Sequence, residues 1–228
     1  MSNIVRKTKD IIILKKSVGT PSQPDPSGEP DAMTLLASEL RSLGERAELF
    51  PIHRIDRTVG GLLLFARNKR SAAELSLDIA QERIEKTYFA ILEGEPPCDS
   101  ARLSDYLFKD SVLKISRVVD GSKKGAKLAA LDYSVIGKIN TQKGVRTLVS
   151  IRLLSGRFHQ IRAQFSSRGL PLVGDKKYGS REVMARVPAL FSAGLEFELY
   201  GERITEFSLP DTDKYPWNLF TPECYKNC

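Results

Sequence analysis

"HRIDRTVGGLLLFARN", residues 53–68, places a single carboxylate, Asp56, between Arg54 and Arg57 and just ahead of an apolar run. The uninterrupted run Leu62–Ala66 predicts a buried strand. A carboxylate immediately before such a strand lies at the rim of the core, on backbone that the core anchors. We therefore expect Asp56 to be rigidly held.

The rest of the chain mixes strand patterns with isolated helix patterns. Strands are predicted over 11–14, 86–94, 130–138, 145–156 and as a pair within 195–209. Helices are predicted within 31–44, from the capping-box pair Ser71 and Glu74 to about Arg83, and over 157–168. Residues 95–130 show little periodicity apart from a basic loop, 121–127. This alternation predicts an α+β fold on a mainly antiparallel sheet with flanking helices, and not a doubly wound one.

Charge and composition narrow the classes of function. The 228 residues carry a net charge of +7, and the basic residues are spread along the chain. Such a domain is suited to a polyanion, although solubility alone also explains the charge. No apolar stretch is long enough to cross a membrane, and the polar N-terminus lacks the apolar segment of a secretory signal. The three cysteines are too few and sparse for a disulfide framework, so we expect a cytoplasmic protein.

The two histidines, His53 and His159, occur in the two most unusual local sequences. Neither has a cysteine or carboxylate at metal-ligand spacing, so structural hydrogen bonding is the stronger interpretation for both. Cys224 and Cys228 lack a second ligand pair. We expect no metal site.

Asp56 is the first candidate for chemistry. Neighbouring positive charge favours the ionised carboxylate. A fixed, charged and partly desolvated carboxylate suits a nucleophile or an electrostatic stabiliser. The alternative is an Arg–Asp salt bridge at the edge of a strand.

The predicted helix over 157–168 supplies a partner. Arg162 lies near the border of its apolar face, where a guanidinium needs a carboxylate, and Asp56 is an available one. Arg157 and Arg168, nearer the helix ends, are free to meet phosphates. Tyr88 is the third candidate: a strand tyrosine usually packs in a core, but a phenol can also stack on an extruded base and move a proton.

Four stretches resemble motifs of the RluA-type pseudouridine synthases, in the order of that family. Residues 53–68 resemble its H-R-L-D signature, and 12–28 resemble the motif around N-K-P-x-G. Residues 85–94 resemble its K-x-Y-x-A strand. "SGRFHQIRAQFSSRGLPLVGDKKYG", residues 155–179, resembles its G-R-x-H-Q-I-R block and the G-D-x-x-Y-G that ends it.

The resemblance implies an RNA pseudouridine synthase and a role for each matching residue. Asp56 would be the catalytic aspartate, and Arg162 would pair with it and keep it charged. Tyr88 would stack on the target uracil and take the proton from C5. Arg54 would fill the gap that the flipped nucleotide leaves, and Ile161 would wall the base pocket. Whether Asp56 attacks C1′ of the sugar or C6 of the ring stays open.

The remaining implications concern substrate and organisation. His53, Arg57, His159 and Arg157 are expected to contact the substrate, a structured ribosomal or transfer RNA. The reaction rearranges one nucleotide, so no cofactor is expected. We expect one catalytic domain over 1–228, acting as a monomer, without membrane contact and without a preceding S4 domain.

The sequence also departs from the family pattern. Lys15 and Lys16 stand in the N-K-P motif, "RTVGG" replaces R-x-T-S-G, and Gln164 stands where a second histidine is common. Two other functions stay open: an RNA-binding protein or chaperone that keeps the fold without catalysis, and a glycosidic hydrolase using Asp56. The hydrolase would need a second carboxylate as an acid, and none is obvious near these motifs.

Overall fold

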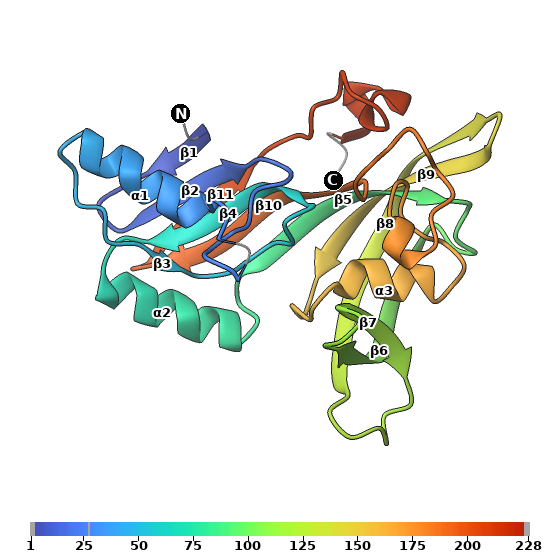
Figure 1. The fold of residues 1–228 in the computed structure, drawn as a ribbon, viewed down its shortest axis with the longest axis horizontal. Coiled ribbons are helices and arrows are strands. Elements are labelled where there is room, and N and C mark those ends of the chain that lie inside the picture. The colour runs from blue at the N-terminus through green and yellow to red at the C-terminus, as the bar shows by residue number, and fades with distance from the viewer. Residues whose placement is uncertain (1–2, 27, 226–228) are drawn as a thin grey trace. The chain divides into compact units, whose positions relative to one another are not determined.

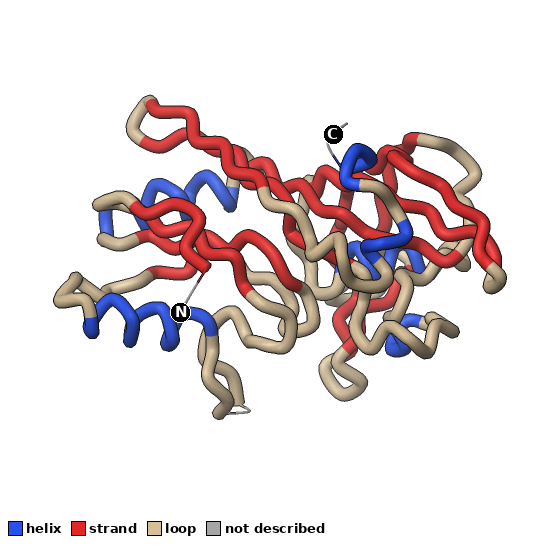
Figure 2. The backbone as a smooth tube through the Cα atoms, turned by 90° about the horizontal axis from the view of Figure 1, so that it is seen from above, coloured by secondary structure: helices blue, strands red, loops and turns tan. Residues whose placement is uncertain are grey.

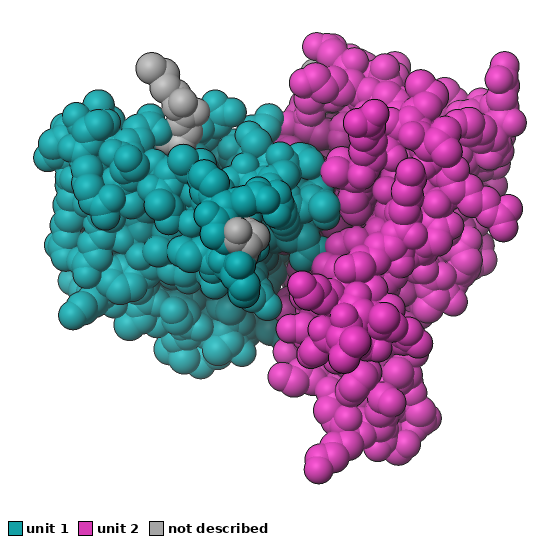
Figure 3. All heavy atoms as spheres, in the orientation of Figure 1, with its two compact units in different colours: residues 1–86, 192–208 teal, residues 87–191, 209–228 magenta. Residues whose placement is uncertain are grey.

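The computed structural model describes residues 3–26 and 28–225. The chain divides into two compact units, shown in different colours in Figure 3. The first unit contains residues 1–86 and 192–208, and the second contains 87–191 and 209–228. Both units combine helices with strands (Figure 2). Each unit is therefore assembled from two stretches that are distant in sequence.

The first unit is built on a set of hydrogen-bonded strands. They are β1 (Asn3–Lys7), β2 (Ile11–Lys16), β3 (Phe50–Pro51), β4 (Gly60–Ala66), β10 (Leu190–Leu199, from Ser192 onward) and β11 (Glu202–Phe207). Their order is β1-β2-β4-β10, with β3 also paired to β4 and β11 to β10. The pairs β1–β2, β2–β4, β3–β4 and β10–β11 are antiparallel. Every residue of β4 is buried, as predicted for the run after Asp56.

Two helices, α1 (Ala32–Ser42) and α2 (Lys69–Ala80), cover opposite faces of these strands (Figure 1). Successive side chains of a strand point to opposite faces. Accordingly Phe65 of β4 belongs to a buried cluster with Leu36 and Leu40 of α1. Its neighbour Leu64 belongs to another cluster with Leu75 of α2. The core therefore has two layers, and β4 lies between them.

The start of α2 differs from the prediction. The side chain of Asn68 accepts the Ser71 N–H at 2.9 Å and so provides the N-cap. Ser71 is the third residue of the helix, and its hydroxyl donates to the Asp10 carbonyl at 2.9 Å. The predicted capping box of Ser71 and Glu74 is wrong because a better cap lies three residues earlier.

The second unit contains β5 (Glu85–Glu93, from Thr87 onward), β6 (Ser100–Asp110), β7 (Ile115–Val119), β8 (Lys127–Thr141) and β9 (Gly144–Leu153). They are ordered β5-β9-β8-β6-β7, and each pair of neighbours is antiparallel. β6 and β7 were not predicted. In β6 only Leu103 and Leu107 are fully buried. They lie on one face with the polar Asp105 between them, so the sequence of the strand shows little apolar alternation.

The helices of the second unit are short. They are α3 (Gln160–Ser166) and the 3₁₀ turns η1 (Lys176–Tyr178), η2 (Trp217–Leu219) and η3 (Pro222–Tyr225). α3 is shorter than the predicted 157–168 because His159 adopts a left-handed conformation, with φ 51°. A left-handed residue cannot continue a right-handed helix. Ala163 packs α3 into a cluster with Leu107 and Ala129.

The expected α+β fold on mainly antiparallel strands is confirmed. The prediction of a single catalytic domain over 1–228 stays a prediction. Within residues 3–26 and 28–225, no helix has the length and apolarity needed to cross a membrane.

Candidate active site

The backbone around Asp56 is fixed within the first unit. The Ser22 hydroxyl donates to the Ile55 carbonyl at 2.7 Å and accepts the Ile55 N–H at 3.2 Å. On the other side, the Asp56 carbonyl accepts the Val59 N–H at 2.9 Å, which closes a turn just before β4. Asp56 therefore sits between two hydrogen-bonded residues, and its side chain is partly buried.

Lys16 is a cation of the first unit that interacts electrostatically with Asp56. Its ammonium group donates to the carbonyl of Thr20 at 2.7 Å and to that of Arg57 at 3.4 Å. Burial lowers the pKa of Lys16 to about 8, and the negative charge of Asp56 opposes this shift. In the sequence, Lys16 stands out only as a departure from the N-K-P motif. Its position within that motif is the signal that could have identified it as a residue near Asp56.

The two arginines beside Asp56 have different surroundings. Arg57 donates from Nε to the Gly19 carbonyl at 2.8 Å, and its guanidinium forms an ion pair with Glu29. Arg57 thus has partners other than Asp56, and the expectation that the neighbouring arginines keep Asp56 charged stays a prediction. Arg54 is exposed and forms no hydrogen bond or ion pair with the residues that the structure describes. Arg54 is thus available to a ligand, as the resemblance implies.

His53 has a structural contact. Its Nε2 accepts the Leu64 N–H at 3.1 Å, which ties the segment before Asp56 to β4. Burial lowers the pKa of His53 to about 3, and the positive charge of Lys86 contributes. His53 is therefore neutral at physiological pH, with its proton on Nδ1. This favours the structural interpretation of His53; its contact with substrate stays a prediction.

In the second unit, Arg162 is held by a carboxylate that no local sequence pattern indicated. Its Nε and Nη2 donate to the two carboxylate oxygens of Asp175 at 2.6 and 2.8 Å. Arg162 is only 4% exposed and Asp175 only 1%. The ring of Tyr178 lies 4.9 Å from the guanidinium carbon. Asp175 and Tyr178 belong to "GDKKYG", residues 174–179, so the motif was visible but its contact with Arg162 was not.

His159 joins the same cluster through Tyr178. The Tyr178 hydroxyl accepts the Ser116 N–H at 2.7 Å and lies 3.0 Å from Nδ1 of His159. Burial lowers the pKa of His159 to about 3, and the charge of Arg162 adds to the shift. A neutral His159 carries one ring proton, so its tautomer decides whether Nδ1 accepts from the Tyr178 hydroxyl or donates to it. The structure thus brings His159 and Arg162 together around one phenol.

The other predicted residues of this unit are placed as follows. Tyr88 of β5 is 5% exposed and Ile161 of α3 is 4% exposed. Arg157 is exposed and forms no ion pair within the described part of the chain. Arg168 instead pairs with Asp105, with Nη1 at 3.0 Å from the carboxylate, so the expectation that it is free for phosphates is wrong.

Asp56 belongs to the first unit, and Tyr88 and Arg162 belong to the second. The predicted pairing of Asp56 with Arg162 therefore remains a proposal.

Unpaired positive charge gathers along the β6–β7 hairpin and the turn that follows it. Three acids lie there. Asp105 pairs with Arg168, Asp110 accepts the N–H of Leu113 at 2.9 Å, and Asp120 accepts that of Ser122 at 2.9 Å. Six cations of this region have no carboxylate partner among the described residues. We call these side chains the hairpin cations: Lys109, Lys114, Arg117, Lys123, Lys124 and Lys127.

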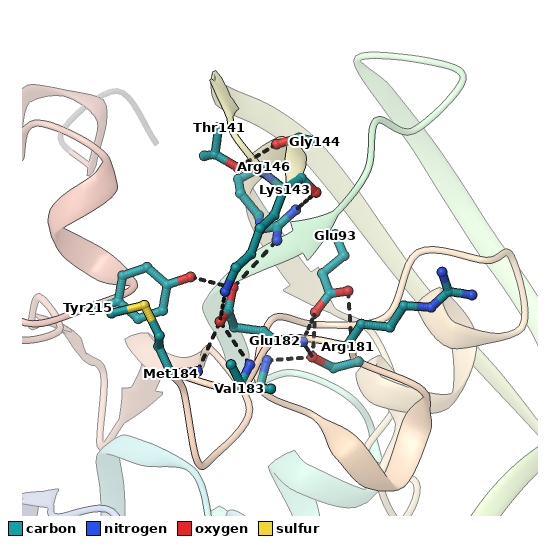
Figure 4. Close-up of polar contacts among 12 residues, drawn as sticks. Glu93, Thr141, Lys143, Gly144, Arg146, Arg181, Glu182, Val183, Met184 and Tyr215 are labelled. Carbon is teal, nitrogen blue, oxygen red and sulfur yellow. Dashed lines mark hydrogen bonds and ion pairs between the residues drawn. The ribbon is translucent and has the colours of Figure 1, made fainter.

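A separate buried cluster surrounds Glu182 (Figure 4). Its carboxylate accepts from Lys143 at 2.8 Å, from the Tyr215 hydroxyl at 2.7 Å and from the Met184 N–H at 2.9 Å. Burial alone would raise the pKa of Glu182, but these donors and the charge of Lys143 outweigh it and lower the pKa to about 2. The cluster joins the β8–β9 turn to two later segments. It leaves no local signal in the sequence because its members are far apart in the chain.

Potential metal ligands are dispersed. Within residues 3–26 and 28–225, no three His, Cys, Asp or Glu side chains are grouped to hold a metal ion. Cys98 and Cys224 are free thiols. Cys228 lies outside the described residues, so the structure does not test whether Cys224 and Cys228 could share a metal ion.

Comparison with known proteins follows the same motifs. The family model described as RNA pseudouridylate synthase matches residues 10–167. Ribosomal large subunit pseudouridine synthase C of Buchnera aphidicola is 34% identical over 145 residues, which are 64% of this chain and 44% of that protein. An uncharacterized RNA pseudouridine synthase of Bacillus subtilis is 26% identical over 189 residues, 82% of this chain and 61% of that protein.

Solved structures show the same fold. Human RNA Pseudouridylate Synthase Domain Containing 1 matches with a TM-score of 0.75 and 23% identity, covering 98% of this chain and 87% of that one. Human RNA Pseudouridylate Synthase Domain Containing 4 also gives a TM-score of 0.75, at 20% identity, with 92% of this chain and 89% of that one covered.

The family model covers well over half of the chain, so the chain belongs to the RNA pseudouridylate synthase family. The resemblance to the RluA-type branch is confirmed by the relatives named ribosomal large subunit pseudouridine synthase C. The chain spans 44% and 61% of the lengths of the Buchnera and Bacillus relatives.

Proposed function

We propose that this protein isomerises uridine to pseudouridine in RNA. The observation that carries the proposal is the family match over residues 10–167, which contains Asp56, Tyr88 and Arg162 together. The fixed backbone around Asp56 and the buried, anchored guanidinium of Arg162 add support, because such chemistry needs preorganised charge.

The reaction would proceed within one nucleotide. The C1′–N1 bond breaks, the uracil turns, and a C1′–C5 bond forms; C5 loses a proton and N1 gains one. The target base must leave its stack before this can happen. Asp56 supplies the ionised carboxylate, Arg162 pairs with it, and Tyr88 stacks on the base and takes the C5 proton. Arg54, exposed beside Asp56, occupies the space that the flipped nucleotide leaves.

We further propose that the substrate is a structured ribosomal or transfer RNA and that the protein acts as a cytoplasmic monomer. The hairpin cations support RNA contact, since unpaired lysines and arginines neutralise phosphates and release counterions. The proposal also places five further residues near the bound RNA: Ile161, His159, Arg157, His53 and Arg57.

The test uses purified protein and total RNA from a strain that lacks the gene. Pseudouridines are mapped by carbodiimide treatment and primer extension. We expect one or a few uridines to be converted by the wild type and by Asp213→Asn, which changes an exposed carboxylate, and none by Asp56→Asn. Equal mapping patterns with and without the wild-type protein would refute the proposal.

The same experiment separates the two other functions. A chaperone would leave all uridines unchanged, and Asp56→Asn would restore growth to the deletion strain as well as the wild type does. A glycosidic hydrolase would release free uracil, which chromatography of the small-molecule fraction detects.

A further inference from the structure

Tyr178 lies where three parts of the second unit meet. Its ring packs over the guanidinium of Arg162 from α3, at 4.9 Å from the guanidinium carbon. Its hydroxyl accepts the N–H of Ser116 from β7 at 2.7 Å and lies 3.0 Å from His159. Tyr178 is 9% exposed, so these contacts are made away from water.

Arg162 is fixed in orientation as well as in position. A guanidinium is a planar fork with five N–H donors. Asp175 accepts from one edge of that fork through two hydrogen bonds, of 2.6 and 2.8 Å, and Tyr178 covers one face. An edge contact and a face contact together define the plane of the group. The donors that Asp175 does not use therefore point in one set direction.

Both anchors belong to one rigid turn. The Tyr178 N–H donates to the Asp175 carbonyl at 2.9 Å, and the Tyr178 carbonyl accepts the Ser166 hydroxyl at 2.7 Å. Ser166 is the last residue of α3, the helix that carries Arg162. A side chain at Gly174 would overlap the Val187 carbonyl, so the turn begins at a position that only glycine fits. The turn and the helix consequently hold each other in place.

The same phenol connects Arg162 to the hairpin cations. Ser116 lies in β7, between Lys114 and Arg117, and its hydroxyl donates to the Phe158 carbonyl just before α3. A displacement of β7 would therefore act on Tyr178 directly. In the proposed function the hairpin cations contact RNA phosphates. The hydrogen bond from the Ser116 N–H to the Tyr178 hydroxyl therefore connects the RNA-contacting hairpin to a residue that orients Arg162.

We propose that Asp175 and Tyr178 are positioning residues that set the plane of Arg162 for the reaction, and that Tyr178 links this setting to the β6–β7 hairpin. The inference rests on the proposed function and deepens it. If these residues had only a structural role, their substitution would lower the stability of the protein but would not selectively slow the isomerisation of bound RNA.

The test separates RNA binding from chemistry. Tyr178→Phe keeps the ring over Arg162 and removes the hydroxyl that holds β7 and His159. We expect the single-turnover rate at saturating enzyme to fall by about 10-fold while the dissociation constant for RNA changes by less than about 2-fold. Tyr133→Phe is the matched control: it removes another buried hydroxyl of this unit, which donates to the Cys98 carbonyl at 3.1 Å, and it should keep the wild-type rate.

Asp175→Asn is the second variant. It keeps the size of the side chain and removes the charge that holds both guanidinium donors, so the rate should fall by roughly 100-fold with RNA binding again retained. Wild-type rates in Tyr178→Phe, or a rate decrease no larger than that of Tyr133→Phe, would overturn the inference. Failure of both Tyr178→Phe and Asp175→Asn to fold, by circular dichroism and thermal melting, would equally assign these residues a structural role. A wild-type protein that forms no pseudouridine would instead refute the proposed function.

Discussion

The hydroxyl of Ser22 satisfies both backbone groups of Ile55, donating to its carbonyl at 2.7 Å and accepting its N–H at 3.2 Å. Ile55 is 7% exposed and immediately precedes Asp56. A loop side chain thus replaces the strand partner that this extended segment lacks. The position of Asp56 depends on a residue 34 positions earlier, in a proline-rich stretch without regular structure.

Ser22→Ala should weaken both the fold and the reaction. It leaves a buried N–H and a buried carbonyl without a partner, which costs on the order of 1–3 kcal/mol. We expect a lower free energy of unfolding in urea and a slower single-turnover rate, because Asp56 is less well fixed. Ser42→Ala removes an exposed hydroxyl bonded to the Glu39 carbonyl and should change stability by less than about 0.5 kcal/mol. Equal stability of the two variants would contradict the argument.

Gly61→Ala should prevent stable folding of the first unit. Gly61 has φ 117°, and a methyl group there would lie 2.6 Å from the Ser192 nitrogen and closer still to its carbonyl oxygen. Backbone cannot yield as a flexible side chain can, so the destabilisation should exceed about 3 kcal/mol. Gly44→Ala is the control: it has φ 71° but open space around it, and strain alone should cost about 1 kcal/mol. Thermal melts compare the two variants. If Gly61→Ala had the same melting temperature as Gly44→Ala, β10 would not be packed against this position.

Glu182→Gln should remove acid-sensitive stability. The folded pKa of Glu182, about 2, lies below its ordinary value of 4.5, so its contribution is present above pH 4.5 and is lost as pH falls toward 2. The variant should be less stable than the wild type at pH 7 by roughly 2–3 kcal/mol, and the difference should shrink near pH 3. Urea unfolding at both pH values measures it. Glu95→Gln, an exposed partner of Lys138, serves as the control, and a difference that stays constant with pH would show that charge is not the cause.

Neutralising hairpin cations should weaken RNA binding in a salt-dependent way. The triple change of Lys114, Arg117 and Lys124 to alanine removes three charges that lack carboxylate partners in the described chain. The slope of log K against log salt should become shallower by about 0.7–0.9 for each phosphate that the variant no longer neutralises. Filter binding from low to moderate salt measures the slope. Lys138→Ala removes a lysine already paired with Glu95 and Asp99 and should leave the slope as it was.

Local pattern sufficed for the parts of the fold whose burial is regular. The run at 62–66 became β4 with every residue buried, and Leu36 and Leu40 became the buried face of α1. Leu43, within the predicted range 31–44, is 61% exposed because it is the C-cap, beyond the last residue of the helix. β6 and β7 were missed because their stability comes from pairing with β8 and with each other, which no local window contains.

The sequence motifs name candidate site residues, whose roles stay predictions, but they do not show the contacts that those residues make. Asp56, Tyr88 and Arg162 stand at motif positions, but the motifs do not show that Asp175 holds Arg162 or that Glu29 takes Arg57. Those pairings join residues from separate elements, so they follow from tertiary packing. The burial of Lys16, which lowers its pKa, likewise depends on a loop that carries no periodic signal.

Each unit contains a stretch from late in the chain, so the order of synthesis limits when each unit can complete its folding. Residues 192–208, which supply β10 and β11 to the first unit, follow almost the whole of the second. As the polypeptide leaves the ribosome, β4 and its neighbours lack their β10 partner until residues 192–208 have been synthesised. Residues 209–225 are needed in turn to complete the second unit. Neither unit is complete early in synthesis, so a nascent protein truncated before residue 192 would lack a finished core and would be a substrate for chaperones and proteases.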